Sequence, residues 1–217
     1  MAVLDHIVVV AASLDQGLDY CEALLGIRPP KGGEHERMGT HNHLLNLGGD
    51  IYLEVISINP SANAPKRPRW FGLDSSEQQA RAAAEPFLAT FVARTNGLVT
   101  AAKAFPSVGS TQEMTRGELR WQITIPDDGL LVENGTVPAL IEWPDGIEPA
   151  RSMPDFGFRL LTLTACHPHP QALRRTWDAI QLDDDRLSIH GIDKGEVPYL
   201  VAELATPTGT KIISGKV

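Results

Sequence analysis

The sequence LDHIVVV at residues 4–10 and its counterpart IYLEVI at residues 51–56 decide the fold. Both stretches are apolar and rich in β-branched residues, which predicts two buried strands. The first strand carries His6 and the second carries Glu54. Imidazole and carboxylate groups bind borderline divalent metals such as zinc, manganese, iron and nickel, and strands hold such groups more rigidly than loops do. The pair therefore suggests a metal-centred cavity.

The segment between these strands contains a predicted helix and two further strands. Ser13 is a suitable N-cap, apolar residues follow it at helical spacing, and Gly26 ends the helix. Residues 31–33 (Lys-Gly-Gly) read as a turn, residues 40–47 alternate as a strand, and Gly-Gly-Asp at 48–50 makes a tight hairpin. The order is β-α-β-β-β if a short strand precedes residues 40–47.

The same order of elements recurs along the chain. A second unit ends, like the first, in a glutamate flanked by apolar residues, Glu142. These patterns predict an α+β fold of repeated βαβββ modules. The predicted division is a first module at 1–58, a connector with a short helix at 59–85, a second module at 86–150 and a third βαβββ-like unit at 151–217.

Composition excludes several classes of protein. The net charge of -8 argues against nucleic-acid and anionic-membrane partners, because their phosphates would be repelled. No apolar run is long enough to span a bilayer. The start of the chain reads as a strand without a basic leader, and Cys21 and Cys166 lie in apolar contexts. We therefore expect a cytoplasmic protein with two buried free thiols.

The module pattern resembles the vicinal oxygen chelate superfamily, which includes glyoxalase I, extradiol dioxygenases and the fosfomycin and bleomycin resistance proteins. The strongest resemblance is to its glyoxalase-like domain branch. There a histidine precedes Gly-Thr-x-Asn, followed by Tyr-Leu-Glu. Here these are His35, the sequence GTHN at residues 39–42, and YLE at residues 52–54.

The resemblance implies that paired modules curl into an open, curved barrel of mixed β-sheet with flanking helices. Metal ligands would project inward from the first and last strands of each module. They correspond to His6, Glu54 and Glu142, while Thr90 stands at the remaining histidine position. In the third unit Leu161 and Ile213 take the ligand positions, so that unit is expected to hold no metal.

Other polar residues are candidates for substrate contacts. His35 lies in a predicted Gly- and charge-rich loop, and Thr40 and Asn42 match the family pattern. Arg69 precedes two aromatic residues and is able to pair with a ligand carboxylate. The nearest additional metal ligands are His41 or His43, which share one face of their strand.

The resemblance implies a metal-dependent lyase or isomerase that acts on a small substrate with adjacent oxygens through an enediolate. The ion would be zinc, nickel, manganese or iron, with Glu142 or Glu54 as the base. One alternative is a metal-free protein that binds a small molecule, as bleomycin-resistance proteins do. Another is an extradiol-type dioxygenase with two histidines and one carboxylate around Fe(II). An odd number of units leaves a free sheet edge, which would allow a homodimer.

Overall fold

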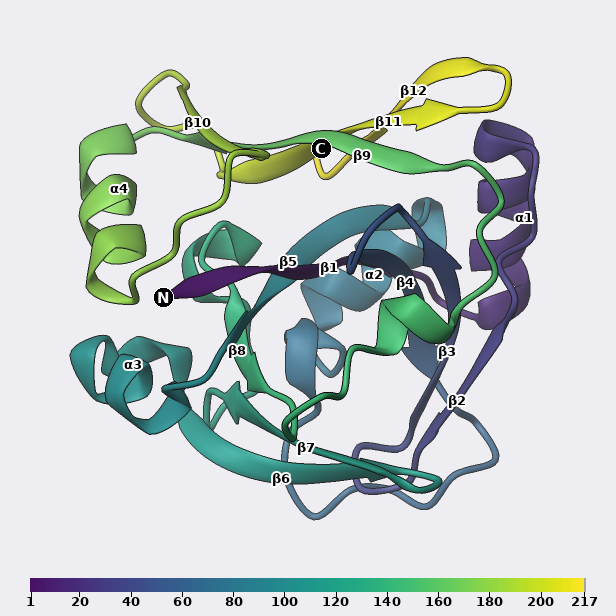
Figure 1. Ribbon diagram of the computed structural model, residues 1–217, viewed down its shortest axis with the longest axis horizontal. Helices are drawn as coiled ribbons and strands as arrows, with labels where there is room; N and C mark the ends of the chain where they lie inside the picture. Colours follow the sequence, from purple (N-terminus) through teal and green to yellow (C-terminus); the bar gives the residue numbers. More distant parts are fainter. Residues whose placement is uncertain (217) are drawn as a thin grey trace.

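The computed structural model describes residues 1–216 and shows an α+β fold built around two sheets (Figure 1). The larger sheet has eight strands in the order β2-β3-β4-β1-β5-β8-β7-β6, and the smaller sheet has four in the order β10-β9-β11-β12. The larger sheet curves until its edge strands β2 and β6 contact each other. Arg37 joins the two edges, because its guanidinium donates to the carbonyl of Glu113 and to Gln112. The predicted curved mixed barrel is confirmed.

The elements follow the order that the sequence predicts. The first set comprises β1 (Ala2–Val10), α1 (Leu14–Leu25), β2 (Lys31–His35), β3 (Thr40–Asn46) and β4 (Tyr52–Ile58). The second comprises α2 (Ser76–Ala84), β5 (Phe87–Thr95), α3 (Leu98–Ala104), β6 (Ser110–Arg116), β7 (Leu119–Ile125) and β8 (Ala139–Glu142). The third comprises β9 (Arg159–His167), α4 (Pro170–Ala179), β10 (Leu187–Gly191), β11 (Tyr199–Thr206) and β12 (Gly209–Ser214). The exact division into units stays a prediction.

Two strands differ from the sequence-based expectation. Residues 31–33 do not form a turn but begin β2, where the missing side chains of Gly32 and Gly33 leave room for Asn42 and Arg116. Strand β6 was missed altogether. It is polar and pairs with β7 alone, so it lacks the apolar alternation of a strand with a buried face.

Alternate residues of β1 enter two different cores. Val8 and Val10 face the inside of the barrel, whereas Ile7 and Val9 join an outer core. Strands β9 and β11 and helix α1 cover that outer face (Figure 1). Complete burial of each such side chain contributes roughly 1.5–3 kcal/mol. The third unit therefore fixes the sheet from outside, and the barrel interior combines an apolar core of its own with the buried polar residues.

Strand pairing sets the polar residues of the first module beside each other. Strand β1 runs parallel to β4, with His6 opposite Tyr52 and Val8 opposite Glu54. His6 and Glu54 thus lie on neighbouring strands and face the same interior.

No helix within residues 1–216 is long and apolar enough to cross a membrane.

Candidate functional site

A β-bulge in β1 places two polar side chains together. Leu4 pairs with Ala93 and His6 pairs with Val92, so Asp5 is an extra residue in the ladder. A bulge re-aims the side chains around it. As a result Asp5 Oδ1 lies 2.6 Å from His6 Nδ1, and both residues are buried. We call this pair the dyad.

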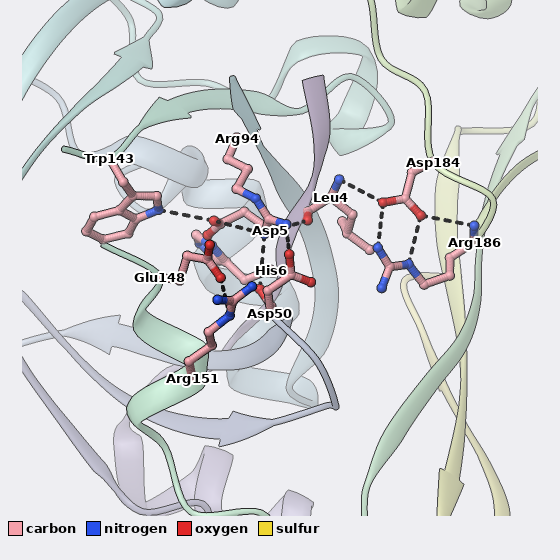
Figure 2. Close-up of polar contacts among 10 residues, drawn as sticks. All are labelled: Leu4, Asp5, His6, Asp50, Arg94, Trp143, Glu148, Arg151, Asp184 and Arg186. Carbon is pink, nitrogen blue, oxygen red and sulfur yellow. Dashed lines mark hydrogen bonds and ion pairs between the residues drawn. The ribbon is translucent and has the colours of Figure 1, made fainter. Parts of the chain in front are cut away.

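Asp5 is the centre of a polar network, and Figure 2 shows Trp143, Arg94 and His6 directed toward its carboxylate. Trp143 Nε1 donates to Oδ2 at 3.1 Å, and Arg94 Nη1 lies 3.8 Å from the same oxygen. Arg94 also pairs with Asp50 in the turn before β4. Asp5 is placed to accept the Nδ1–H of His6, as carboxylates do beside metal-binding histidines. That arrangement leaves the Nε2 lone pair of His6 directed into the barrel.

The third unit supports the strand that carries the dyad. The backbone N–H of Leu4 donates to Asp184 Oδ2 at 3.1 Å, and Arg186 pairs with the same carboxylate at 2.7 Å (Figure 2). Trp177 of α4 is fully buried, and its Nε1 donates to the carbonyl of Thr136 at 3.0 Å. The contact of Asp184 with Leu4 thus supports β1 directly before the bulge, and Trp177 anchors α4 to the segment before β8.

Glu54 faces His6 from the neighbouring strand. Its Oε2 lies 3.6 Å from His6 Nε2, and its Oε1 accepts a hydrogen bond of 2.5 Å from Asn42 Nδ2. The His6 ring stacks on Tyr52, with ring centroids 4.5 Å apart. A buried carboxylate facing a nitrogen lone pair is unfavourable unless a proton or a cation lies between them. The geometry therefore leaves a place for one positive charge.

A small cavity of about 20 Å³ lies at this point. It is lined by His6, His35, Tyr52, Glu54, Trp70, Phe71, Arg116, Trp121, Ile123, Ile141 and Trp143. Since a water molecule occupies roughly 10–15 Å³ of such space, the cavity has room for about one water molecule or ion. The aromatic rings around it exclude bulk water from the polar groups.

His35 is buried at the end of β2 and not in the solvated loop that the sequence suggested. Its Nδ1 lies 3.1 Å from Thr40 Oγ1, and its ring meets Trp70 edge-on with centroids 5.0 Å apart. Burial, together with a smaller contribution from the positive charge of Arg116, lowers the pKa of His35 to about 3. His35 is therefore uncharged near neutral pH.

His6 and Glu54 fit a divalent ion as two of its ligands. Ligand atoms about 2.0–2.2 Å from zinc in a tetrahedral arrangement lie roughly 3.4 Å apart, close to the 3.6 Å between Nε2 and Oε2. Asp5 provides the outer hydrogen bond that metal-binding histidines make. Among residues 1–216, no three His, Cys, Asp or Glu side chains are grouped to hold one ion. Water or substrate would take the remaining positions.

Glu142, expected at the centre, lies elsewhere. Its Oε2 accepts a hydrogen bond of 2.9 Å from the backbone N–H of Leu98, at the start of α3. Its neighbours Ile141 and Trp143 line the cavity, and strand alternation directs Glu142 to the opposite side. The structure thus does not bring Glu142 to His6.

Two further candidates also contribute no group to the cavity. Thr90 donates its hydroxyl to the carbonyl of Gly135 at 3.1 Å, so it presents no ligand. Arg69 pairs with Asp74 at 2.6 Å and docks the connector, while the next residue, Trp70, lines the cavity. In the structure Arg69 thus lies beside the cavity without lining it.

The side chains of β3 alternate between the two faces of the sheet. Thr40 and Asn42 are buried on the inner face, where each holds one cavity residue by the hydrogen bonds given above. They position the site and do not line it. His41 and His43 point to the other face, where His43 Nδ1 lies 2.6 Å from the carbonyl oxygen of Pro29. Neither histidine supplies the additional ligand considered from the sequence.

Several residues of the site were not anticipated. Asp5 carried a signal, since an acidic residue inside an apolar strand and beside a histidine needs a buried partner. No sequence pattern pointed to Trp121, Trp143 and Arg116, because only the closure of the sheet brings them to the first module.

Comparison with known proteins adds a family. A profile described as glyoxalase-like domain matches residues 4–181, and no curated protein sequence matches the chain. A hypothetical protein from Staphylococcus aureus has a similar structure over 99% of this chain and 85% of its own, with 15% identity and a TM-score of 0.57. Methylmalonyl-CoA epimerase from Mycobacterium tuberculosis is similar over 65% and 87%, with 18% identity and a TM-score of 0.41. Methylmalonyl-CoA epimerase from Streptomyces coelicolor is similar over 67% of this chain and 96% of its own, with 17% identity and a TM-score of 0.42.

The family match spans most of the chain and includes the strands that carry His6 and Glu54. The Staphylococcus aureus structure shares the fold over nearly the whole length. The chain belongs to the glyoxalase-like domain family of the vicinal oxygen chelate superfamily.

Proposed function

We propose that this protein is a lyase or isomerase in which His6 and Glu54 hold a divalent ion and a small substrate presents two adjacent oxygens to it. The observation that carries the proposal is the 3.6 Å separation of Nε2 and Oε2 in a small cavity lined by aromatic rings, with Asp5 behind the histidine.

Zinc, nickel, manganese or iron bound there would polarise a substrate carbonyl and stabilise negative charge on its oxygens. The residues of the chain supply the remaining chemistry. Glu54 is the one carboxylate lining the cavity within residues 1–216, which makes it the candidate base for a proton on carbon. Asn42 holds Oε1 and so fixes the orientation of the Glu54 carboxylate.

The cavity wall strengthens these interactions. Trp70, Trp121 and Trp143 exclude water, and charges interact more strongly in such surroundings than in bulk solvent. Uncharged His35 is able to hydrogen-bond a substrate oxygen without repelling the ion. Arg94 and Trp143 keep Asp5, and through it His6, in one orientation.

The proposal is tested by the metal content of untagged protein purified without chelator, measured by mass spectrometry. We expect about one divalent ion per chain, lost in Glu54→Gln and retained in the matched control Glu142→Gln. Protein that is metal-free and takes up no added zinc, nickel, manganese or iron would refute the proposal.

A metal-free binding protein is the second candidate, because most of the side chains that line the cavity are aromatic or apolar. Ligand binding would then be unaffected by chelators. An extradiol oxygenase is less well supported, since His6, His35 and Glu54 line one cavity but are not grouped around a common point. Oxygen uptake with catechols would identify it.

A further inference from the structure

A larger cavity of about 600 Å³ adjoins the small one where β2 and β6 meet, and Arg116 lines both. Its lining includes Lys31 and Gly32 of β2, Leu44 of β3, Arg116 of β6 and the segment 146–154 after β8. We call it the seam groove. Its volume is within the range of roughly 300–1,000 Å³ found for small-molecule sites.

The seam groove and the small cavity at His6 and Glu54 are separated by side chains that both contact. Arg116 lines both of them. Tyr52, which stacks on His6, packs against Leu44 and Ala150 on the groove side. A ligand in the groove therefore lies one side chain away from the proposed reacting groups.

The groove is positively charged although the chain as a whole is acidic. It contains Lys31, Arg116 and Arg151 but only one carboxylate, Glu148. Arg151 is already paired with Glu148 (Figure 2). Lys31 and Arg116 form no ion pair within the described part of the chain. Local positive charge in a concave site of an acidic protein favours an anionic ligand.

The position of Arg116 depends on a glycine. A Cβ atom on Gly33 would lie 2.7 Å from Arg116 Cδ and 2.9 Å from Arg116 Cγ. Gly33 does not have a positive φ, so its backbone needs no glycine. Its missing side chain instead lets the arm of Arg116 cross β2 toward the boundary between the two cavities.

We infer that the seam groove binds a small organic acid whose carboxylate pairs with Arg116 while its other end reaches His6 and Glu54. The guanidinium group is suited to this role because it binds a carboxylate through two parallel hydrogen bonds. This inference rests on the proposed function and names its substrate class: acids with a carboxylate at one end and two adjacent oxygens at the other.

The test uses calorimetric titration of the full-length protein with two sets of probes. One set contains straight-chain 2-oxo diacids such as 2-oxoglutarate, and the other contains 2-oxo monoacids of equal length. We expect the diacids to bind about tenfold more tightly or better, as a charge-assisted contact gives.

Variants identify the group responsible. Arg116→Gln should remove the preference for diacids, whereas Arg120→Gln should keep it, because Arg120 is exposed and pairs with Glu113 outside the groove. Gly33→Ala should weaken the preference without changing any charge, and it serves as the second variant if Arg116→Gln does not fold.

Equal affinity for the two sets, no binding of the diacids, or a preference that survives in both Arg116→Gln and Gly33→Ala would overturn the inference. Metal content distinguishes these results from failure of the proposed function. Arg116→Gln should retain the ion of the wild type, whereas the proposed function fails if the wild type binds no ion at all.

Discussion

The two halves of the barrel have the same order of elements but different chemistry. In the first half, β1 and β4 direct His6 and Glu54 to one point. In the second half, Thr90 bonds to the backbone and Glu142 caps α3. The second half contributes aromatic rings and Arg116 to the same cavity.

This difference shows that one module suffices to place the polar groups while its partner supplies their surroundings. The second half has a bulge of its own at Ala89, beside Thr90, but this residue is apolar, so Thr90 lacks the buried acidic neighbour that Asp5 gives His6. The predictions below test whether the chemistry belongs to the first half alone.

The largest expected effect concerns His35 and pH. Its folded pKa of about 3 is below the unfolded value of 6.5, so the unfolded chain binds more protons between these values. Stability is then complete above pH 6.5 and declines as pH falls toward 3, by roughly 4–5 kcal/mol in total. Urea unfolding between pH 4 and 7.5 measures this loss. His35→Gln should show a clearly shallower decline, and an identical pH dependence would contradict the assignment.

The second prediction compares matching positions in the two halves. His6→Ala should weaken divalent-ion affinity by more than about 100-fold, because even the outer partners of metal ligands are worth about 10–100-fold. Thr90→Ala should leave affinity unchanged and lower stability by about 1 kcal/mol for its lost hydrogen bond. Competition with a chelating indicator measures both. Equal losses in the two variants would show that the halves share the site.

The third prediction concerns the dyad. Asp5→Asn should reduce ion affinity by about 10–100-fold, because the amide no longer holds His6 as a carboxylate does. Zinc titration of folded variant protein tests this, with circular dichroism as the check on folding. Wild-type affinity in Asp5→Asn would mean that the dyad does not orient the histidine.

The smallest effect is expected at Glu142. Glu142→Gln should cost about 1 kcal/mol of stability through its weakened hydrogen bond to the first turn of α3. Thermal unfolding measures the loss, and ion affinity should not change. A drop in ion affinity would show that Glu142 does contribute to ion binding.

Local patterns in the sequence predicted much of the fold. The caps of α1 illustrate this: Ser13 accepts a hydrogen bond from the N–H of Gln16, and Gly26 takes the left-handed conformation with φ 78°. Strand β6 could not be found because an edge strand with polar faces has no apolar alternation.

The site could be predicted only in part. The structure brings His6, Glu54 and His35 to one cavity, because each lies in a strand and its side chain faces the buried interior. The orientation of Glu142 depends on the register of β8 with β7, and that register is a property of the assembled sheet. The closure of the sheet, which brings Arg116 to the cavity, likewise depends on contacts between strands far apart in the sequence.

The most direct test of the central claim is a crystal structure of the protein grown with zinc, with anomalous scattering recorded at the zinc edge. We predict one peak inside the barrel, about 2.0–2.2 Å from both His6 Nε2 and Glu54 Oε2. A zinc ion bound instead in the second half of the barrel, or no peak between these two atoms, would contradict it.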